Sequence, residues 1–367
     1  MKKILHYITY QTFPADTANS LQTISNLKYF VKNNYEVNLY FPLREKNSSN
    51  ELENIQKKYN FNEIINVFGS SHPYPFGKLH FFKRFFYHLS HFLWARKTSK
   101  NFTDAQNKDD YFFTRSDWVL YFLSKKNLNI IFECHQYSKL RNYIFKKVSR
   151  LNNVKIIYLN ELIKKEFNTT PQKSLILASG VDIELFQNIP KNKKIENKIV
   201  FVGNLLRFGK QRNLEKIFSV FQNLEEFSLT IIGGPASESD RLKNIVRELN
   251  LSNVTIRGRL SRQETINEIL SSSYGLLINS DDKHSRLFTS PLKYFEYLAA
   301  DLKVIAVNFP SHNLLPEQSN IYYFENDDLD SLKQSIYRAS ENRFIDVDIE
   351  KYSLNNRVKQ IINFFNH

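Results

Sequence analysis

The stretch SPLKYFEYLAADLKVIAV, residues 290–307, combines the start of a helix with a buried strand. Ser290 is a good N-cap and Pro291 favours the first helical position, so we predict a helix that begins here. The apolar, β-branched run Val304–Val307 is typical of a buried strand. A helix followed at once by a buried strand is the repeating unit of a parallel α/β sheet.

The second half of the chain repeats this unit. Helix-length stretches with apolar residues at helical spacing, such as Leu242–Leu249, alternate with short apolar runs. This alternation predicts a parallel sheet with helices on both faces. The expected strands are Lys198–Val202, Ser228–Ile232, Val254–Ile256, Gly275–Ile278, Val304–Val307 and Ile321–Phe324.

The first half shows the same alternation less regularly. We therefore predict two doubly wound, Rossmann-like α/β domains that face a cleft, with the functional site at the carboxyl ends of the strands. The domains are expected at 1–186 and 198–351, joined by the polar, lysine-rich linker 187–197. The expected elements of the first domain are the strands Ile4–Ile8, Glu36–Tyr40, Asn129–Phe132 and Lys155–Leu159 and the helix Leu21–Val31.

The composition is that of a globular protein, since 42% of the 367 residues are hydrophobic and 24% are charged. Disorder, collagen and a disulfide-rich secreted fold are excluded. Cys134 is the only cysteine, so the chain forms no internal disulfide and no thiolate metal cluster. No Asp/His cluster has the spacing of metal ligands, and we expect neither a metal nor another cofactor.

The N-terminal run Ile4–Ile8 follows two lysines, as in a signal peptide. His6 interrupts the run and no cleavage site follows, so a strand is the better interpretation. No apolar stretch is long enough for a spanning helix. These features predict a cytoplasmic protein.

The net charge of +14 is unevenly distributed. Residues 1–186 carry 27 Lys and Arg against 15 Asp and Glu, and residues 187–367 carry 24 against 22. The basic half is expected to meet an anionic partner. No nucleic-acid-binding motif accompanies the charge, so nucleic acid is not an expected partner.

The segment 78–100 has six basic residues, no acidic residue and seven aromatic residues. A helix here would bury Phe82, Phe85, Phe86 and Phe92 on or near one face. This composition suits a helix lying on anionic lipid at the inner face of the cell membrane. The alternative is a helix that packs its aromatic residues into the core.

The helix start at Ser290 has the features of an anion site. Free N–H groups of Leu292 and Lys293 would point out of the helix start, where phosphate commonly binds. A carboxylate one turn later, at Glu296, can accept hydrogen bonds from both hydroxyls of a ribose. Phosphate and ribose together indicate a nucleotide. The alternative is a capped helix with a surface ion pair between residues 293 and 296.

The stretch Ser290–Ala300, followed by Lys303–Ala306, resembles the signature of retaining GT-B glycosyltransferases (family 4-like, group 1), which use a nucleotide-sugar donor. More distant similarities follow the family's order over most of the chain. They lie at Phe13–Ser20, Arg115–Ser116, Phe132–His135, Gly180–Phe186, Phe201–Asn204, Ile231–Gly234, Val254–Gly258 and Tyr352–Arg357.

The resemblance implies roles for the helix start. Glu296 would bind the ribose, and Ser290 with the backbone of Leu292 and Lys293 would hold the diphosphate. The nucleotide sugar would be a co-substrate, and no metal would be needed.

The resemblance also implies roles for two loops of the donor domain. Arg207 and Lys210, just after Gly203, would neutralise the leaving diphosphate and so lower the barrier. The loop at Arg257 and Gly258 would flank the base.

In the first domain, the resemblance places His135 near the reacting sugar. Asn19 and Ser20 would begin the first helix, close to the phosphates or the acceptor. The last helix, 352–367, would cross back onto this domain.

Three positions depart from the family. Phe288 stands where the family often has a second glutamate. Asn204 stands where it often has an arginine, a role that Arg207 would take. Asp301 replaces the glycine that usually ends the helix, and Asp tolerates a left-handed backbone.

The sequence thus predicts a glycosyltransferase that moves a sugar from a nucleotide-diphosphate sugar, with retention, to a saccharide or lipid-linked acceptor of the cell envelope. Two alternatives stay open. One is a nucleotide-sugar epimerase of the same fold. The other is a non-catalytic membrane- or polyanion-binding scaffold, which Phe288 and Asn204 keep in consideration.

Overall fold

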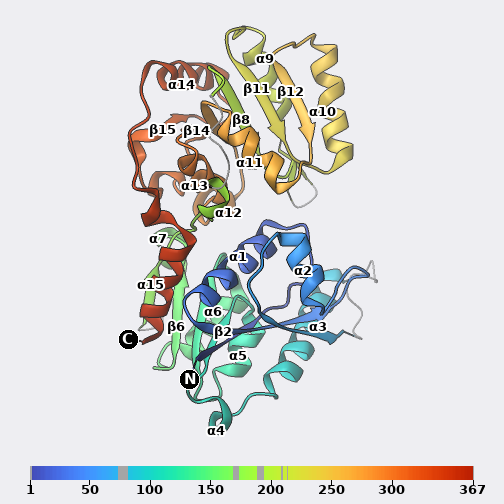
Figure 1. Ribbon diagram of the computed structural model, residues 1–367, viewed down its shortest axis with the longest axis vertical. Coiled ribbons are helices and arrows are strands. Elements are labelled where there is room, and N and C mark those ends of the chain that lie inside the picture. The colour runs from blue at the N-terminus through green and yellow to red at the C-terminus, as the bar shows by residue number, and fades with distance from the viewer. Residues whose placement is uncertain are drawn as a thin grey trace. The chain divides into compact units, whose positions relative to one another are not determined.

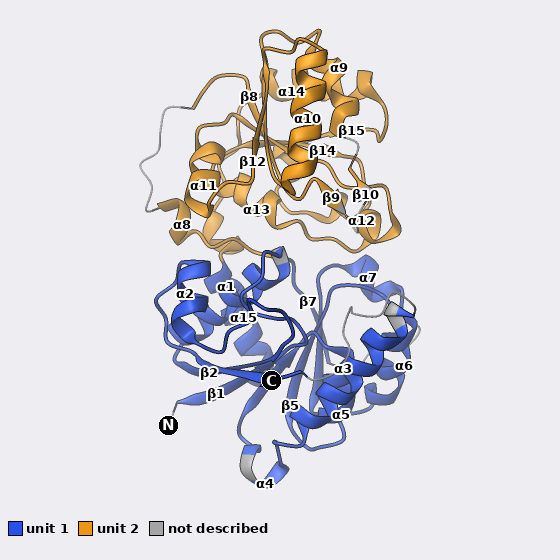
Figure 2. Cartoon of the chain, turned by 90° about the vertical axis from the view of Figure 1, so that its right-hand side faces the viewer, with its two compact units in different colours: residues 1–178, 354–367 blue, residues 179–353 orange. Residues whose placement is uncertain are grey.

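The computed structural model divides into two compact units, residues 1–178 with 354–367 (unit 1) and residues 179–353 (unit 2) (Figure 2). The segment 179–186, expected in the first domain, belongs to unit 2. The reason is local, because the Ser179 amide donates to Ser290 Oγ at 2.8 Å. Residues 188–193 of the expected linker lie outside the described residues. The structure describes residues 2–72, 82–167, 173–187, 194–207, 210–212 and 214–366.

Unit 1 is built on seven parallel strands in the order β3-β2-β1-β4-β5-β6-β7. Its chain up to residue 178 runs from blue to green in Figure 1. The strands are β1 Lys3–Ile8, β2 Tyr35–Leu43, β3 Asn66–Ser71, β4 Tyr111–Thr114, β5 Asn129–Cys134, β6 Val154–Tyr158 and β7 Ser174–Ile176. The helices are α1 Ala18–Lys32, α2 Leu52–Tyr59, α3 Lys83–Ser99, α4 Asp104–Asn107, α5 Asp117–Leu123, α6 Lys139–Val148, α7 Glu161–Lys165 and α15 Leu354–Asn366. Helix α15 packs on α1 and adds Leu354, Val358 and Ile361 to the core of unit 1.

Unit 2 contains six parallel strands in the order β12-β11-β8-β13-β14-β15. The strands are β8 Lys198–Val202, β11 Ser228–Ile232, β12 Val254–Gly258, β13 Tyr274–Leu277, β14 Lys303–Val307 and β15 Ile321–Phe324, with the small hairpin β9 Leu206–Arg207 and β10 Lys210–Gln211. The α-helices are α8 Glu184–Gln187, α9 Phe218–Phe221, α10 Ala236–Glu248, α11 Arg262–Leu270, α12 Lys283–Leu287, α13 Leu292–Ala299 and α14 Leu329–Glu341. The 3-10 helices are η1 Leu214–Ile217, η2 His312–Leu314, η3 Gln318–Asn320 and η4 Ile349–Tyr352.

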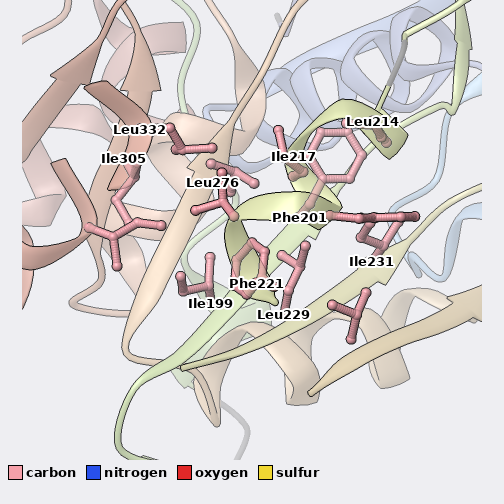
Figure 3. Close-up of a cluster of buried hydrophobic side chains, with 14 of the residues drawn as sticks. Ile199, Phe201, Leu214, Ile217, Phe221, Leu229, Ile231, Leu276, Ile305 and Leu332 are labelled. Carbon is pink, nitrogen blue, oxygen red and sulfur yellow. The ribbon is translucent and has the colours of Figure 1, made fainter. Parts of the chain in front are cut away.

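The core of unit 2 joins its strands to the helices that cover them. Phe201, Leu276 and Ile305 project from neighbouring strands toward one cluster, which α9 and α14 close with Phe221 and Leu332 (Figure 3). Each such side chain contributes about 1.5–3 kcal/mol when it leaves water. Strand β8 lies between β11 and β13, so the order in which successive strands join the sheet changes direction there. Ligands of such sheets bind at the carboxyl ends of the strands beside this switch point.

The predicted α/β fold class with two Rossmann-like domains is confirmed. In unit 2, Lys198–Val202, Ser228–Ile232 and Ile321–Phe324 are strands over the expected residues. In unit 1, strands β3, β4 and β7 were not predicted. Strand β3 is rich in polar residues, and β4 and β7 have only four and three residues, so neither pattern nor length identified them.

Helix α3 does not bury the aromatic face that the sequence predicts. Phe82 and Phe85 are 77% and 61% exposed, so the expectation that they are buried is wrong. The helix packs instead through its C-terminal half, where buried Trp94 donates from Nε1 to Ser70 Oγ at 2.8 Å. Residues 78–81 lie outside the described residues. Within the described ranges, no helix is both long and apolar enough to cross a membrane.

Candidate functional site

Helix α13 begins one residue later than predicted. Its N-cap is Pro291, and Ser290 is not the N-cap because its hydroxyl accepts the Ser179 N–H at 2.8 Å. The amides of Leu292 and Lys293 have no hydrogen-bond partner within the part of the chain that the structure describes. Two N–H groups at a helix start are therefore available to an anion.

Glu296 lies one turn into α13 and is held by two cations. Lys293 Nζ donates to Glu296 Oε2 at 2.7 Å, and Arg262 Nη2 lies 3.0 Å from Glu296 Oε1. Burial alone would raise the pKa of the Glu296 carboxyl, but Arg262 and Lys293 outweigh burial and lower the pKa to about 2. The carboxylate is therefore ionised at neutral pH. We name Lys293, Glu296 and Arg262 the α13 cluster.

The α13 cluster is partly open to solvent. The side chain of Glu296 is 6% exposed, whereas those of Lys293 and Arg262 are 26% and 25% exposed. Burial lowers the pKa of Lys293, and Glu296 opposes that shift. With two cations and one carboxylate, the cluster has a net charge of +1 beside the two amides of α13. This charge suits an anionic ligand.

Sequence reasoning missed Arg262. This residue opens α11 directly after Ser261, whose side chain and that of Glu264 form a reciprocal capping box. A cation in the first turn opposes the helix dipole, as Lys293 does in α13. That shared anomaly is the signal that could have linked the two residues.

The loops after β8, β11 and β12 meet at the carboxyl edge of the unit 2 sheet. The Gly203 amide donates to Ile232 O at 3.0 Å, and the Gly233 amide donates to Gly258 O at 2.9 Å. A Cβ on Gly233 would lie 1.9 Å from Gly203 O, so only glycine fits. Gly203 and Gly258, two of the predicted residues, thus lie along one edge.

Arg257 points along α11 rather than into the glycine loops. Its Nη1 lies 3.7 Å from Glu268 Oε1, and its side chain is half exposed. Arg259 lies against Gly234 instead, where a Cβ would come within 3.2 Å of Arg259 Nε. Arg259 is therefore the residue after β12 that reaches the glycine loops.

The backbones of Arg207 and Lys210 pair across the hairpin β9–β10. This hairpin directly follows Gly203 and β8. The side chains of Arg207 and Lys210 lie outside what the structure describes.

Two of the departures from the family are visible in the structure. Phe288 is buried at the end of α12, with its ring 6.0 Å from that of His284, so this position offers an apolar surface and no carboxylate. Asp301 has a φ of +55°, which confirms the predicted left-handed turn after α13.

In unit 1, His135 belongs to a buried charged group centred on Glu133, at the end of β5. Arg115 Nε donates to Glu133 Oε2 at 2.5 Å, and His135 Nε2 lies 2.9 Å from the same oxygen. Arg357 of α15 donates from Nη2 to Glu133 Oε1 and from Nε to Ala178 O at 2.8 Å. We name Glu133, Arg115, Arg357 and His135 the β5 cluster.

Burial and the neighbouring charges determine the protonation states of Glu133 and His135. Burial alone would raise the pKa of Glu133, yet Arg115, Arg357 and His135 hold it well below its usual range. Burial and Arg115 lower the pKa of His135 to about 4, so the imidazole is neutral at pH 7. An ionised carboxylate only accepts hydrogen bonds, so His135 carries its proton on Nε2 and keeps Nδ1 as an acceptor.

The two predicted acceptor-side residues have different environments. Asn19 joins the β5 cluster, because its Oδ1 accepts from Arg115 Nη1. Ser20 is fully buried, forms a capping box with Thr17 and donates from Oγ to Ala15 O at 2.8 Å. The Ser20 hydroxyl therefore holds the start of α1.

No group of three His, Cys, Asp or Glu side chains among the described residues is arranged to hold a metal ion. Asp281 pairs with Arg286 at 2.9 Å, and Asp282 caps α12 by accepting the Ser285 amide at 3.0 Å. The adjacent aspartates 281 and 282 thus have separate structural partners.

Residues 196–342 match the family model described as Glycosyl transferases group 1. This range contains Gly203, the loop after β12 and the whole α13 cluster. No curated relative matches the sequence.

Solved structures of glycosyltransferases resemble the chain over its whole length at low sequence identity. A glycosyltransferase from Rickettsia africae ESF-5 is 15% identical with a TM-score of 0.65, covering 99% of this chain and 94% of its own. A TarM mutant from S. aureus, in complex with Fondaparinux, α-GlcNAc-glycerol and UDP, is 12% identical with a TM-score of 0.70 and full coverage of both chains. The lipopolysaccharide outer core galactosyltransferase WaaB is 13% identical with a TM-score of 0.61, covering 99% and 97%. These likenesses show the fold. Residues 196–342 therefore form a group 1 glycosyltransferase domain, within a chain that has the GT-B fold.

Proposed function

We propose that this glycosyltransferase takes its sugar from a nucleotide-diphosphate sugar and transfers it, with retention, to a saccharide or lipid-linked acceptor of the cell envelope. The observation that carries the proposal is the start of α13. Two amides without partners in the described chain lie there beside a cluster of net charge +1. A diphosphate next to a ribose is the ligand that matches both features.

Each group of the α13 cluster has a role in this proposal. The amides of Leu292 and Lys293 bind the diphosphate. The Glu296 carboxylate has about four lone-pair sites and uses two for Lys293 and Arg262, so it can still accept from the ribose hydroxyls. Arg262 and Lys293 keep Glu296 ionised, which makes it a stronger acceptor.

In the reaction, the bond between the anomeric carbon and the β-phosphate oxygen breaks, and the acceptor hydroxyl oxygen forms the new bond to that carbon. The acceptor proton leaves with the departing diphosphate. Arg207 and Lys210 neutralise the charge that develops on this leaving group. Neutral His135 accepts a hydrogen bond from a sugar hydroxyl at Nδ1, while Glu133 fixes its ring.

Two neighbours in structure support an envelope acceptor. The TarM complex contains α-GlcNAc-glycerol and UDP, and WaaB is a lipopolysaccharide galactosyltransferase. The basic first half of this chain is suited to an anionic acceptor or surface.

The test is isothermal titration of UDP, GDP and their sugars. Glu296→Ala is expected to weaken binding by at least about tenfold, which corresponds to about 1.4 kcal/mol. Glu296→Gln keeps the shape of the side chain and controls for folding, and exposed Glu341→Ala is the matched surface control. Unchanged affinity in both Glu296 variants would remove the nucleotide-site assignment.

Product analysis separates transfer from its alternatives. NMR of the product is expected to show a new glycosidic bond with the anomeric configuration of the donor. An epimerised sugar and release of nucleotide in the absence of acceptor would identify an epimerase. Absence of donor binding would favour a scaffold.

We also propose that α3 contacts anionic lipid. Phe82 and Phe85 are the most exposed aromatic residues among residues 82–100, and Tyr87 and Leu89 are partly exposed beside them. Apolar side chains on a basic segment match an interfacial helix.

Liposome flotation tests this contact. Liposomes with anionic phosphatidylglycerol are expected to carry the protein upward in flotation, and Phe85→Glu is expected to reduce the floated fraction several-fold. Equal flotation of Phe85→Glu and wild type would contradict lipid contact through α3; Tyr143→Glu, on α6, is the control.

A further inference from the structure

Unit 2 has a cavity of about 770 Å³, and among the residues that the structure describes its lining includes none of those proposed to bind the nucleotide. Its walls come from β10 and η1, the loops after β13 and β15, and the start of α14. Its volume lies within the roughly 300–1,000 Å³ typical of small-molecule sites.

The floor of this cavity is apolar. Ile217, Phe324 and Leu332 line it and belong to the core cluster of unit 2, where Ile217 and Leu332 are seen above the sheet (Figure 3). Because these side chains are fixed by the core, they form a preformed surface. Such a surface can pack against the C–H face of a sugar ring.

The rim of the cavity is polar and joins two loops. Asn326, after β15, donates from Nδ2 to Asp281 Oδ2 at 3.3 Å and to Asp327 Oδ2 at 3.0 Å. Asp281 also pairs with Arg286 at 2.9 Å, and Asp327 with Lys216 at 2.7 Å. The side chains of these ion pairs are about half exposed, so they can be rearranged at little cost.

Ser280 is one of the residues that line the cavity. Its hydroxyl is covered by neighbouring atoms and has no hydrogen-bond partner among the described residues. A buried polar group without a partner costs about 1–3 kcal/mol, and rotation of the Ser280 side chain toward a ligand hydroxyl would remove that cost. Ser280 therefore points to a ligand that carries hydroxyl groups.

The charges of the lining disfavour an anionic ligand. The described residues of the lining include four carboxylates (Asp281, Asp282, Asp327 and Asp328) and two cations (Arg212 and Lys216). A nucleotide or a sugar phosphate needs the opposite balance. The α13 cluster, with its net positive charge, and this cavity thus select different ligands.

We propose that the cavity is a second binding site, for a neutral oligosaccharide. Its hydroxyls would pair with the amide of Asn326, the carboxylates of Asp281 and Asp327 and the hydroxyl of Ser280, and its apolar face would pack on Phe324. The proposal rests on the proposed function in one respect, since the saccharide is the acceptor or product glycan of the transferase. The site would hold a segment of that glycan away from the nucleotide.

The experiment is saturation-transfer NMR on the full chain, with UDP present to occupy the nucleotide site. The probes are neutral trisaccharides of glucose, mannose and N-acetylglucosamine, with a trisaccharide of glucuronic acid as the charged comparison. At least one neutral trisaccharide is expected to bind wild type. Ser280→Trp, which places a large side chain in the lining of the cavity, is expected to abolish that binding, and the rim variant Asn326→Ala to weaken it at least tenfold. Exposed Asn313→Ala is the matched control and is expected to change nothing.

Three results would overturn the proposal: no neutral trisaccharide binds, only the glucuronic acid trisaccharide binds, or binding survives both Ser280→Trp and Asn326→Ala. Asn326→Ala keeps the test valid if Ser280→Trp does not fold. Titration of nucleotide sugar into the same variants separates the two sites. If a variant keeps its affinity for the donor but no longer binds the trisaccharide, the trisaccharide binds in the cavity. If wild type does not bind the donor, only the proposed function is refuted.

Discussion

The two units each hold a buried glutamate between two cations, but the clusters differ in their access to solvent. Glu133 is fully buried, and its partners Arg115 and Arg357 are 7% and 3% exposed. Around Glu296, both cations keep about a quarter of their side-chain surface in solvent. A buried carboxylate with two cations is thus no functional signature by itself. The closed β5 cluster ties α15 to β5, whereas the two cations of the open α13 cluster remain in contact with solvent.

The largest effect is expected from breaking the closed cluster. Arg357→Ala leaves Glu133 with less compensation in a buried site, and breaking a buried ion pair costs about 3–5 kcal/mol. Both tryptophans, Trp94 and Trp118, lie in unit 1, so their fluorescence during urea unfolding reports that unit. Exposed Lys351→Ala is the control, and a loss below about 1 kcal/mol for Arg357→Ala would show that the β5 cluster does not stabilise unit 1.

A smaller effect is expected from titrating the open cluster. The folded pKa of Glu296, about 2, lies below its ordinary value of 4.5, so its contribution is fully present above pH 4.5 and is lost as the pH falls toward 2. At about 1.4 kcal/mol per pKa unit, the contribution is about 3 kcal/mol.

Urea unfolding followed by circular dichroism checks this contribution. From pH 5 to pH 3, wild type is expected to lose about 2 kcal/mol more unfolding free energy than Glu296→Gln, which does not titrate there. Parallel curves for the two proteins would show that Arg262 and Lys293 do not hold the Glu296 pKa down.

Removing one cation of the open cluster is expected to affect binding more than folding. Arg262→Ala reduces the net charge of the cluster from +1 to zero. Nucleotide affinity is expected to fall about three- to tenfold, and this loss is expected to shrink at high salt because the site is partly exposed. Exposed Arg247→Ala, on α10, is the matched control. If Arg262→Ala left the nucleotide affinity unchanged, the nucleotide would have to bind elsewhere.

The smallest effect is expected at the far end of α13. Asp301 has a left-handed backbone, which costs a β-branched residue about 1–2 kcal/mol. Asp301→Val is therefore expected to lower the thermal midpoint, Asp301→Gly to leave it nearly unchanged, and both to retain nucleotide affinity. If Asp301→Gly abolished binding, the open cluster would depend on more than the start of its helix.

The sequence could predict elements whose signals are local. Strand β8 is a continuous apolar run, and the turn at Asp301 follows from the residue type that ends α13. The prediction that Ser290 caps α13 is wrong, because the Ser290 hydroxyl accepts a hydrogen bond from the amide of Ser179, more than a hundred residues earlier. Local propensity carries no information about such a contact.

The candidate site also combines a contact that the sequence can predict with contacts that only the fold creates. Lys293 and Glu296 are three residues apart on a helix, so their ion pair was visible as an alternative to ligand binding. Arg262 comes from another helix and completes the cluster only in the fold. In unit 1, the sequence places Glu133 in a motif but does not reveal its partners. Arg115 and Arg357 reach Glu133 only because the fold brings the end of β4 and α15 to it.

The most direct measurement is a crystal structure of the protein with UDP or GDP, whichever titration selects. We expect phosphate oxygens within hydrogen-bond distance of the Leu292 and Lys293 amides, and both ribose hydroxyls on the Glu296 carboxylate. A nucleotide bound in the cavity beside Ser280, or an α13 start that stays without ligand while the nucleotide occupies another surface, would contradict the assignment.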